Sequence, residues 1–286
     1  MIPRFSIVTA TRGTSPYLQH CAASVADQGL AEVEQVVVHK GPPPGALVNG
    51  GVCRLLAQAA GSAGLYGALN QGLAATQGDI LAWLNDDEQY LPGTLDFVRN
   101  YFDAHPKVDL LFGDFLVVDA GGRLLAFRKG HAPRWPYILA SHLYLFSCTL
   151  FFRRRVWASG LRFDVSFQSA GDMGFVARAL RAGFRAAHVA RYLAAFTWTG
   201  DNLSASAVAR AEEQRLRAAA PVWVRGLRGP LTLARLLEKF FSGAYRQTWP
   251  LTYDLFLNDP AQRTAVTASA ASWRWPHAAE RGLQAR

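Results

Sequence analysis

The run Asp86-Asp87-Glu88 carries the most evident chemistry in the chain, and it follows a short apolar stretch that ends just before Asn85. Adjacent carboxylates repel one another, which is costly at the end of a buried strand unless a cation or hydrogen-bond donors compensate them. Mg²⁺ and Mn²⁺ suit such oxygen ligands and typically complete their coordination with substrate phosphates. The run therefore predicts a metal site that works with a phosphate-bearing ligand. The alternative is a solvated acidic turn before a helix that starts near Pro92.

The acidic run is one of three polar segments that directly follow predicted strands. Strands are expected at 5–9, 33–38 and 79–84, and the polar residues after them are Thr11, His39 and the acidic run. Predicted helices lie between these strands, and such alternation favours a mostly parallel sheet. In parallel sheets, ligands collect beyond the carboxyl ends of the strands. These segments are therefore expected to share one site.

The rest of the chain predicts an α/β fold in two parts. Ser15 is expected to cap the first helix, and Asp172 to cap or open a helix that ends at Ala182. Two runs within 108–127 predict a hairpin, which makes the sheet mixed. The other expected elements are helices at 51–60, 66–76 and from Pro92, and a strand at 187–196. We therefore expect a mixed sheet flanked by helices over residues 1–203, with a helical region over residues 204–286 packed on it.

Composition narrows the classes of function. Half of the residues are hydrophobic, which predicts a globular core, and the longest apolar stretch, 143–152, is too short to cross a bilayer. The first nine residues show no secretory pattern, so a cytoplasmic location is expected. The three cysteines are too scattered for a disulfide framework and are expected to be buried thiols.

Positive charge is concentrated in the second half of the chain. Residues 151–286 carry 20 Lys and Arg against 9 Asp and Glu, a surplus of +11. This asymmetry suits a polyanion, a pyrophosphate-bearing ligand or an anionic membrane face. Nucleic acid is not expected as a partner, because the basic residues form no dense run with interleaved aromatics. Arg153-Arg154-Arg155 is a candidate for pyrophosphate binding, with a solvated helix start as the alternative.

Several segments together resemble glycosyltransferase family 2, whose members have a GT-A fold. The resemblance covers about residues 4 to 204, and its segments follow the family's order. They are Ser6-Ile7-Val8-Thr9-Ala10-Thr11, Gly64–Gly72, Leu84-Asn85-Asp86-Asp87-Glu88-Gln89-Tyr90-Leu91-Pro92-Gly93, Gly113-Asp114, Phe151–Arg154 and Asp172–Arg178. The resemblance implies a GT-A domain that uses a nucleotide-sugar donor together with Mg²⁺ or Mn²⁺.

The resemblance also implies roles for individual residues. Asp87 matches the aspartate that binds the metal, and Asn85 occupies the first acidic position of the same motif. Asp172 matches the catalytic base, which takes the acceptor proton while the hydroxyl attacks the anomeric carbon with inversion. The residues expected to contact the donor are Thr9, Ala10, Thr11, His39, Asn70 and Asp86.

Some positions depart from the family's pattern. His39 stands where an aspartate commonly contacts the base and ribose, which leaves the identity of the nucleotide open. Gly67 replaces an aspartate, and Thr199 stands where many relatives carry a metal-ligating histidine. We expect an active transferase that acts on a glycan or lipid-linked saccharide in surface polysaccharide synthesis, with peripheral contact to the inner face of the membrane. The alternative is a GT-A domain that binds or scaffolds without catalysis.

Overall fold

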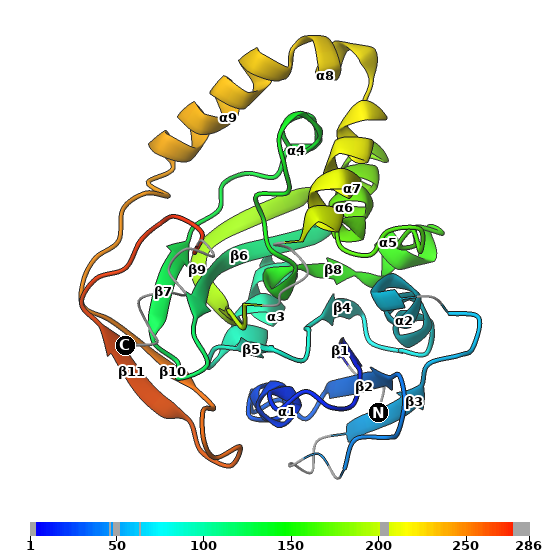
Figure 1. Cartoon of the computed structure of the whole chain (residues 1–286), viewed down its shortest axis with the longest axis vertical. Helices are drawn as coiled ribbons and strands as arrows, with labels where there is room; N and C mark the ends of the chain where they lie inside the picture. Colours follow the sequence, from blue (N-terminus) through cyan, green and yellow to red (C-terminus); the bar gives the residue numbers. More distant parts are fainter. Residues whose placement is uncertain (1–3, 46, 48–51, 63, 201–205, 277–286) are drawn as a thin grey trace.

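A mixed sheet of nine strands forms the centre of the structure, and helices pack on both of its faces (Figure 1). The computed structural model describes residues 4–45, 47, 52–62, 64–200 and 206–276. The strand order is β3-β2-β1-β4-β8-β6-β9-β5, and β7 pairs with β6. The strands are β1 Phe5–Thr11, β2 Val33–His39, β3 Val52–Ala57, β4 Ile80–Trp83, β5 Glu88–Tyr90, β6 Leu110–Val118, β7 Leu124–Arg128, β8 Phe151–Arg153 and β9 Ala186–Thr197.

The amino-terminal part of the sheet is parallel. β1 pairs in parallel with β2 and β4, and β2 pairs in parallel with β3. The carboxyl ends of β1, β2 and β4 therefore lie at one edge of the sheet. Antiparallel pairing begins where β8 joins β4 and continues in the β6–β7 hairpin. The predicted mixed α/β sheet flanked by helices is thus confirmed.

The helices cover the sheet in two apolar layers because β1 alternates its side chains between the faces. Phe5 and Ile7 pack with α1 and α3, whereas Val8 packs with α2 and α6. These helices are α1 Leu18–Ala26, α2 Gly64–Ala74, α3 Thr94–Ala104 and α6 Gly171–Arg181. The remaining helices are α4 Trp135–Ala140, α5 Arg154–Ala158, α7 Ala207–Ala218, α8 Val222–Gly226 and α9 Arg228–Phe241, with a short 3₁₀ turn at Ser147–Thr149.

Three local predictions are wrong. Residues 52–57 form β3 rather than a helix, because they pair in parallel with β2 at the sheet edge. Ser15 does not cap α1: the helix begins at Leu18, and the Ser15 hydroxyl accepts the backbone N–H of Tyr17 at 3.3 Å in the preceding turn. Residues 204–286 are not wholly helical, since β10 Leu251–Leu255 and β11 Thr264–Ala268 form an antiparallel hairpin. The domain division at residue 203 stays a prediction.

Within the described ranges, no helix is both long enough and apolar enough to cross a bilayer.

Gly72 allows α2 to pack directly on β1. A Cβ at Gly72 would lie 2.4 Å from Val8 Cγ1 and 3.0 Å from Val38 Cγ2, and both valines are fully buried strand residues. Gly72→Ala should therefore lower the free energy of unfolding by about 1–3 kcal/mol, the usual cost of overpacking. Gly229→Ala is the matched control, because no atom lies within 4 Å of the added carbon in that helix. Chemical denaturation of both variants checks the prediction, and equal stability would show that α2 has room to move.

Candidate functional site

The Thr11 hydroxyl joins the end of β1 to the acidic loop after β4. Thr11 pairs with His39 in the parallel register of β1 and β2, so the two residues lie at the same sheet edge. Thr11 Oγ1 donates to Asp86 Oδ2 at 2.6 Å and accepts the Gly13 backbone N–H at 3.0 Å. The structure therefore brings together three of the residues, Thr11, His39 and Asp86, for which the resemblance implies contact with the donor.

The Asp86 carboxylate faces the loop after β1. Burial raises its pKa, while hydrogen bonds from Thr11 and Ser15 and the charge of Arg12 oppose the rise. These contacts fix the loop against the acidic segment. Asp86 thus shapes the strand-end site and holds its carboxylate toward Thr11.

His39 is nearly buried and has a defined proton position. Its Nδ1 lies 3.0 Å from the Gly41 carbonyl oxygen, which can only accept, so Nδ1 carries the proton in the neutral ring. Nε2 is then a hydrogen-bond acceptor. An aspartate at this position would also accept, so neutral His39 retains one acceptor without the negative charge.

Thr9 and Ala10 precede Thr11 in β1. The Thr9 side chain is fully buried, and its hydroxyl accepts the Gln35 amide at 3.1 Å. It faces the interior of the fold, so a contact with a nucleotide cannot come from this hydroxyl without rearrangement. Ala10 is partly buried and packs against the apolar cluster around α2.

Glu88 turns inward and is held by Asn85. The Asn85 backbone N–H donates to Glu88 Oε2 at 2.7 Å, and its side-chain amide donates to Oε1 at 3.0 Å. Glu88 is fully buried, and burial together with repulsion from Asp87 raises its pKa to about 8. The sequence did not indicate this inward clamp, although the three-residue spacing of Asn85 and Glu88 suits one hydrogen-bonded turn.

The three carboxylates therefore do not form a cage around one ion. Asp86 faces Thr11, Glu88 faces Asn85, and within the described ranges no three His, Cys, Asp or Glu side chains are placed to hold a metal. The expected metal ligands, Asp87 and Asn85, stay a prediction. Asp87 is partly exposed, and its carbonyl accepts the Thr197 backbone N–H at 3.2 Å, which ties the acidic loop to β9.

Asp172 is the second residue of α6, and Ala170 occupies the cap position. A capping role for Asp172 is therefore wrong. Its Oδ1 accepts the Met173 backbone N–H at 2.7 Å, and its own N–H lies 3.3 Å from the Tyr66 hydroxyl on α2. A Cβ at Gly171 would lie 2.6 Å from the Tyr66 ring, so glycine is needed for this close packing.

Burial raises the pKa of Asp172 to about 6. Hydrogen bonds from Met173 and Tyr66 oppose this shift, and the nearby charge of Glu213 adds to it. A carboxyl group with a pKa near the working pH is suited to accept a proton and release it again. The role of general base, which the resemblance implies for Asp172, stays a prediction here.

Glu212, which the sequence did not single out, anchors the loop that leads into α6. Its carboxylate on α7 accepts three backbone N–H groups, from Gln168 at 2.6 Å, Ser169 at 2.8 Å and Ala170 at 2.9 Å. No local pattern could indicate this role, because the partners lie more than forty residues apart in the sequence. Glu212 therefore fixes the backbone on which Asp172 stands.

Asn70 links α2 to the same region. Its amide nitrogen donates to the Phe163 carbonyl at 2.9 Å, and its oxygen accepts the Phe163 N–H at 2.9 Å. The side chain is thus committed to the backbone before α6. Its predicted contact with the donor stays a prediction.

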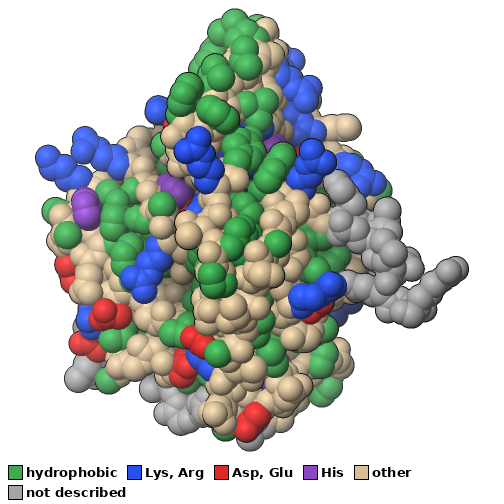
Figure 2. Space-filling view, turned by 90° about the vertical axis from the view of Figure 1, so that its left-hand side faces the viewer, with side chains coloured by type: hydrophobic (Ala, Val, Ile, Leu, Met, Phe, Trp, Pro, Cys, Tyr) green, Lys and Arg blue, Asp and Glu red, His purple; other side chains and the backbone are tan. Residues whose placement is uncertain are grey.

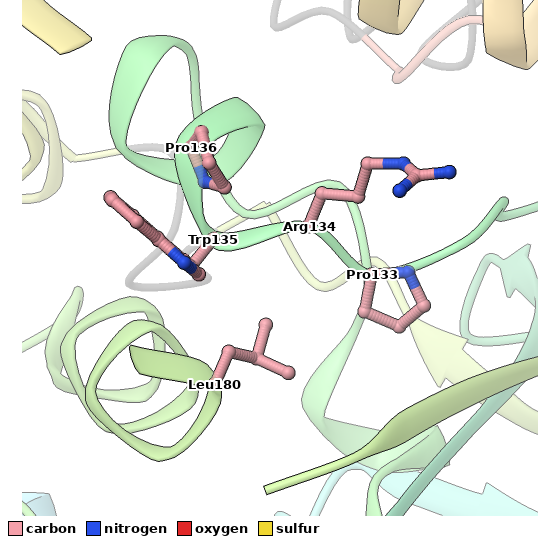
Figure 3. A pocket seen from close by; sticks show the side chains of 5 residues that line it. All are labelled: Pro133, Arg134, Trp135, Pro136 and Leu180. Atoms are coloured by element: carbon pink, nitrogen blue, oxygen red, sulfur yellow. The ribbon is translucent and has the colours of Figure 1, made fainter. Parts of the chain in front are cut away.

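The arginine run and the tryptophan at α4 lie outside this arrangement. Arg153 and Arg154 donate to backbone carbonyls, and Arg155 pairs with Asp109, so the run fixes neighbouring loops. Trp135 lines a small hollow beside α4 and points toward Leu180, while Arg134 points away from it (Figure 3). The lining residues, Pro133, Arg134, Trp135, Pro136 and Leu180, include none of the predicted site residues.

Comparisons with known proteins agree with the observed fold. The profile of Glycosyl transferase family 2 matches residues 6–171. S. aureus TarS 1-349 in complex with UDP-GlcNAc is similar in structure, with a TM-score of 0.62 and 20% identity over 83% of this chain and 73% of that chain. The mannosyltransferase PcManGT from Pyrobaculum calidifontis, in complex with GDP-Man and Mn²⁺, gives a TM-score of 0.55 and 15% identity over 85% and 76% of the two chains. No curated protein matches the sequence.

The raised pKa of Asp172 makes the stability of the protein depend on pH. The folded protein holds this proton more tightly than the unfolded chain, so stability falls as the pH rises from 3.8 to about 6. The Asp172→Asn variant has no carboxyl group to ionise, so its stability should not fall over this pH range. Above pH 6 its free energy of unfolding should exceed that of the parent by on the order of 2 kcal/mol. Denaturation measured across this pH range checks the change.

Asp164→Asn provides a control of opposite sign. Hydrogen bonds from Ser166 lower the pKa of Asp164, so its contribution to stability is present at neutral pH and is lost in acid. Removing its charge should therefore make the variant less stable than the parent at neutral pH. A parent-like pH profile for Asp172→Asn would show that its carboxyl group titrates normally.

Proposed function

The chain belongs to glycosyl transferase family 2 and is a glycosyltransferase, and we propose that it transfers a sugar from a nucleotide-sugar donor with inversion. The proposed acceptor is a glycan or lipid-linked saccharide in surface polysaccharide synthesis. The observation that carries the proposed mechanism is the Asp172 carboxyl group, fixed at the start of α6 with its pKa raised to about 6. The class of reaction follows from membership of the family, and the proposed general base is the Asp172 carboxyl group.

The proposed donor site lies at the carboxyl ends of β1, β2 and β4. Thr11 and Asp86 hold the loop after β1 in place, and His39 offers the acceptor Nε2 toward hydrogen-bond donors of the base. Neighbouring structures support a nucleotide-sugar donor in this fold, since their complexes contain UDP-GlcNAc and GDP-Man.

Asp87 and the side-chain oxygen of Asn85 are the groups that would hold Mg²⁺ or Mn²⁺ together with the donor phosphates. These oxygen ligands suit Mg²⁺ and Mn²⁺, which are commonly bound by one carboxylate, with substrate phosphates completing the coordination. When bound, the ion would offset the negative charge that develops on the departing diphosphate. The Asn85 amide already donates to Glu88, which orients the side chain before any ligand arrives.

In the proposed reaction, ionised Asp172 accepts the proton of the acceptor hydroxyl. The hydroxyl oxygen forms a bond to the anomeric carbon while the bond from that carbon to the diphosphate oxygen breaks, and the electron pair leaves with the diphosphate. Attack from the face opposite the leaving group inverts the configuration. Tyr66 and Glu212 do not touch the substrate in this scheme; they position Asp172 and the preceding loop.

Asp87→Asn should abolish the metal-dependent part of donor binding. A donor at a hundred times its dissociation constant stabilises the folded state by about 2.7 kcal/mol, so a thermal unfolding screen with individual sugar nucleotides and Mn²⁺ identifies the donor. The variant should lose the additional shift that Mn²⁺ provides. Asp79→Asn, a surface carboxylate paired with Arg4, should behave like the parent.

Unchanged donor affinity and metal dependence in Asp87→Asn would remove Asp87 from the metal site. A chain that binds a donor but transfers sugar to no acceptor would favour the binding or scaffolding alternative that the altered residues at Asn85 and Thr199 suggest.

Asp172→Asn should transfer sugar at least about a hundredfold more slowly, because an amide cannot take the acceptor proton. Its affinity for the donor should stay at the parent's level. In the parent, kcat/KM should rise with pH through about 6 and level off above it, since the ionised carboxylate is the active form. A variant that transfers sugar at the parent's rate to the true acceptor would exclude Asp172 as the base.

A further inference from the structure

Helix α9 presents its apolar side chains to solvent. Leu233 is 58% exposed, Leu237 49%, Phe240 59% and Phe241 80%. A surface helix of a globular protein normally turns its apolar stripe toward the core. In α9, Leu231 packs against the core, but the four side chains above point away from it and leave a large apolar face exposed among the described residues.

Three polar side chains of α9, those of Arg235, Glu238 and Lys239, face the protein. Arg235 is 6% exposed and lies over the Tyr144 ring at 5.6 Å. Lys239 lies over Tyr245 at 4.8 Å, and Glu238 accepts from Arg134 at 2.9 Å. These contacts fix the rotation of the helix about its axis. The apolar face therefore cannot turn inward without breaking an ion pair and two cation–π contacts.

The apolar face continues onto α8. Val222 is 74% exposed, Trp223 47% and Leu227 49%. We call residues 222–241 the α8–α9 ridge. The ridge forms an arch at one end of the molecule's longest axis, away from the central sheet (Figure 1). In the space-filling view, apolar side chains cap this end and basic side chains lie beside them (Figure 2).

The positive charge around the ridge indicates which kind of partner can bind there. Residues 222–246 contain five basic residues and one acidic residue, and Arg225, Arg228 and Arg246 are exposed. Glu238, the acidic residue, is paired with Arg134. Arginines beside an exposed row of leucine and phenylalanine are the features by which interfacial helices bind anionic lipid.

We propose that the α8–α9 ridge docks on the surface of an anionic lipid bilayer. Phe240, Phe241 and the exposed leucines enter the boundary between headgroups and acyl chains, while the arginines contact lipid phosphates. A second copy of the chain is a poorer partner, because two ridges with the same positive surplus would repel one another. The protruding shape also suits insertion into a lipid surface.

Docking of the ridge on lipid does not depend on the proposed reaction. The benefit of docking for catalysis, however, rests on the proposed function. If the acceptor is lipid-linked, as proposed above, attachment through the ridge holds the protein at the surface where that acceptor resides. The ridge adds this localisation without a membrane-crossing helix. The experiment therefore measures docking and donor binding separately.

Co-sedimentation with vesicles tests the proposal. The parent should bind vesicles of equal parts phosphatidylglycerol and phosphatidylcholine, bind pure phosphatidylcholine far less, and lose binding as salt is added. The double variant Phe240→Ser with Phe241→Ser should bind at least about tenfold more weakly, because it loses two exposed aromatic side chains of the apolar face. Val165→Ser is the control, since Val165 is 52% exposed outside the ridge.

Arg225→Gln with Arg246→Gln should reduce binding to anionic vesicles and lessen its dependence on salt. Thermal shifts with the donor should be the same for all variants, so that failure of docking is separated from failure of the donor site. Equal vesicle binding by the parent and the phenylalanine variant would overturn the proposal. So would a dimeric parent that the same substitutions convert to a monomer, since a second copy would then cover the ridge.

Discussion

The candidate site depends on hydrogen bonds that hold buried or partly buried carboxylates in place. Asp86 accepts from Thr11, Glu88 from Asn85, and Asp172 from the Met173 backbone. Removing a carboxylate from water is costly, so each must be held by donors that face it directly. The donors therefore determine where each carboxylate points.

The same interaction extends the site beyond the sheet domain. Glu212 on α7 binds three consecutive backbone N–H groups just before Asp172, and Tyr66 on α2 donates to the Ser169 carbonyl at 2.6 Å. The backbone that carries the proposed base is thus held from both sides. The carboxyl-terminal region is consequently part of the support for the proposed base, and the α8–α9 ridge follows α7 in the same region.

The sequence predicted the features that short local patterns determine. The ends of β1, β2 and β4 follow from apolar runs that stop at polar residues, and α6 begins within one residue of the predicted start because Asp172 precedes a helical pattern. The residues of 52–57 suit either a helix or a strand, and only the parallel pairing with β2 makes them β3. Local periodicity cannot predict that pairing, because it depends on a neighbour in space.

The features that were missed depend on contacts between distant segments. Asn70 faces Phe163 and Glu212 faces the loop before α6, and neither contact is visible in residue spacing. The hairpin of β10 and β11 was hidden by the Ala- and Arg-rich composition of the helices that precede it. The outward apolar face of α9 could not be anticipated either, because an amphipathic pattern alone does not say which face meets the protein.

The central claim is that the donor diphosphate binds at the carboxyl ends of β1, β2 and β4, with a metal ion held by Asp87. Anomalous diffraction from a crystal containing the donor nucleotide and Mn²⁺ tests it most directly. If Asp87 holds the metal, a manganese peak should lie within bonding distance of an Asp87 carboxylate oxygen, beside the donor phosphates. A nucleotide bound elsewhere, or a manganese peak with no Asp87 oxygen in its coordination sphere, would contradict it.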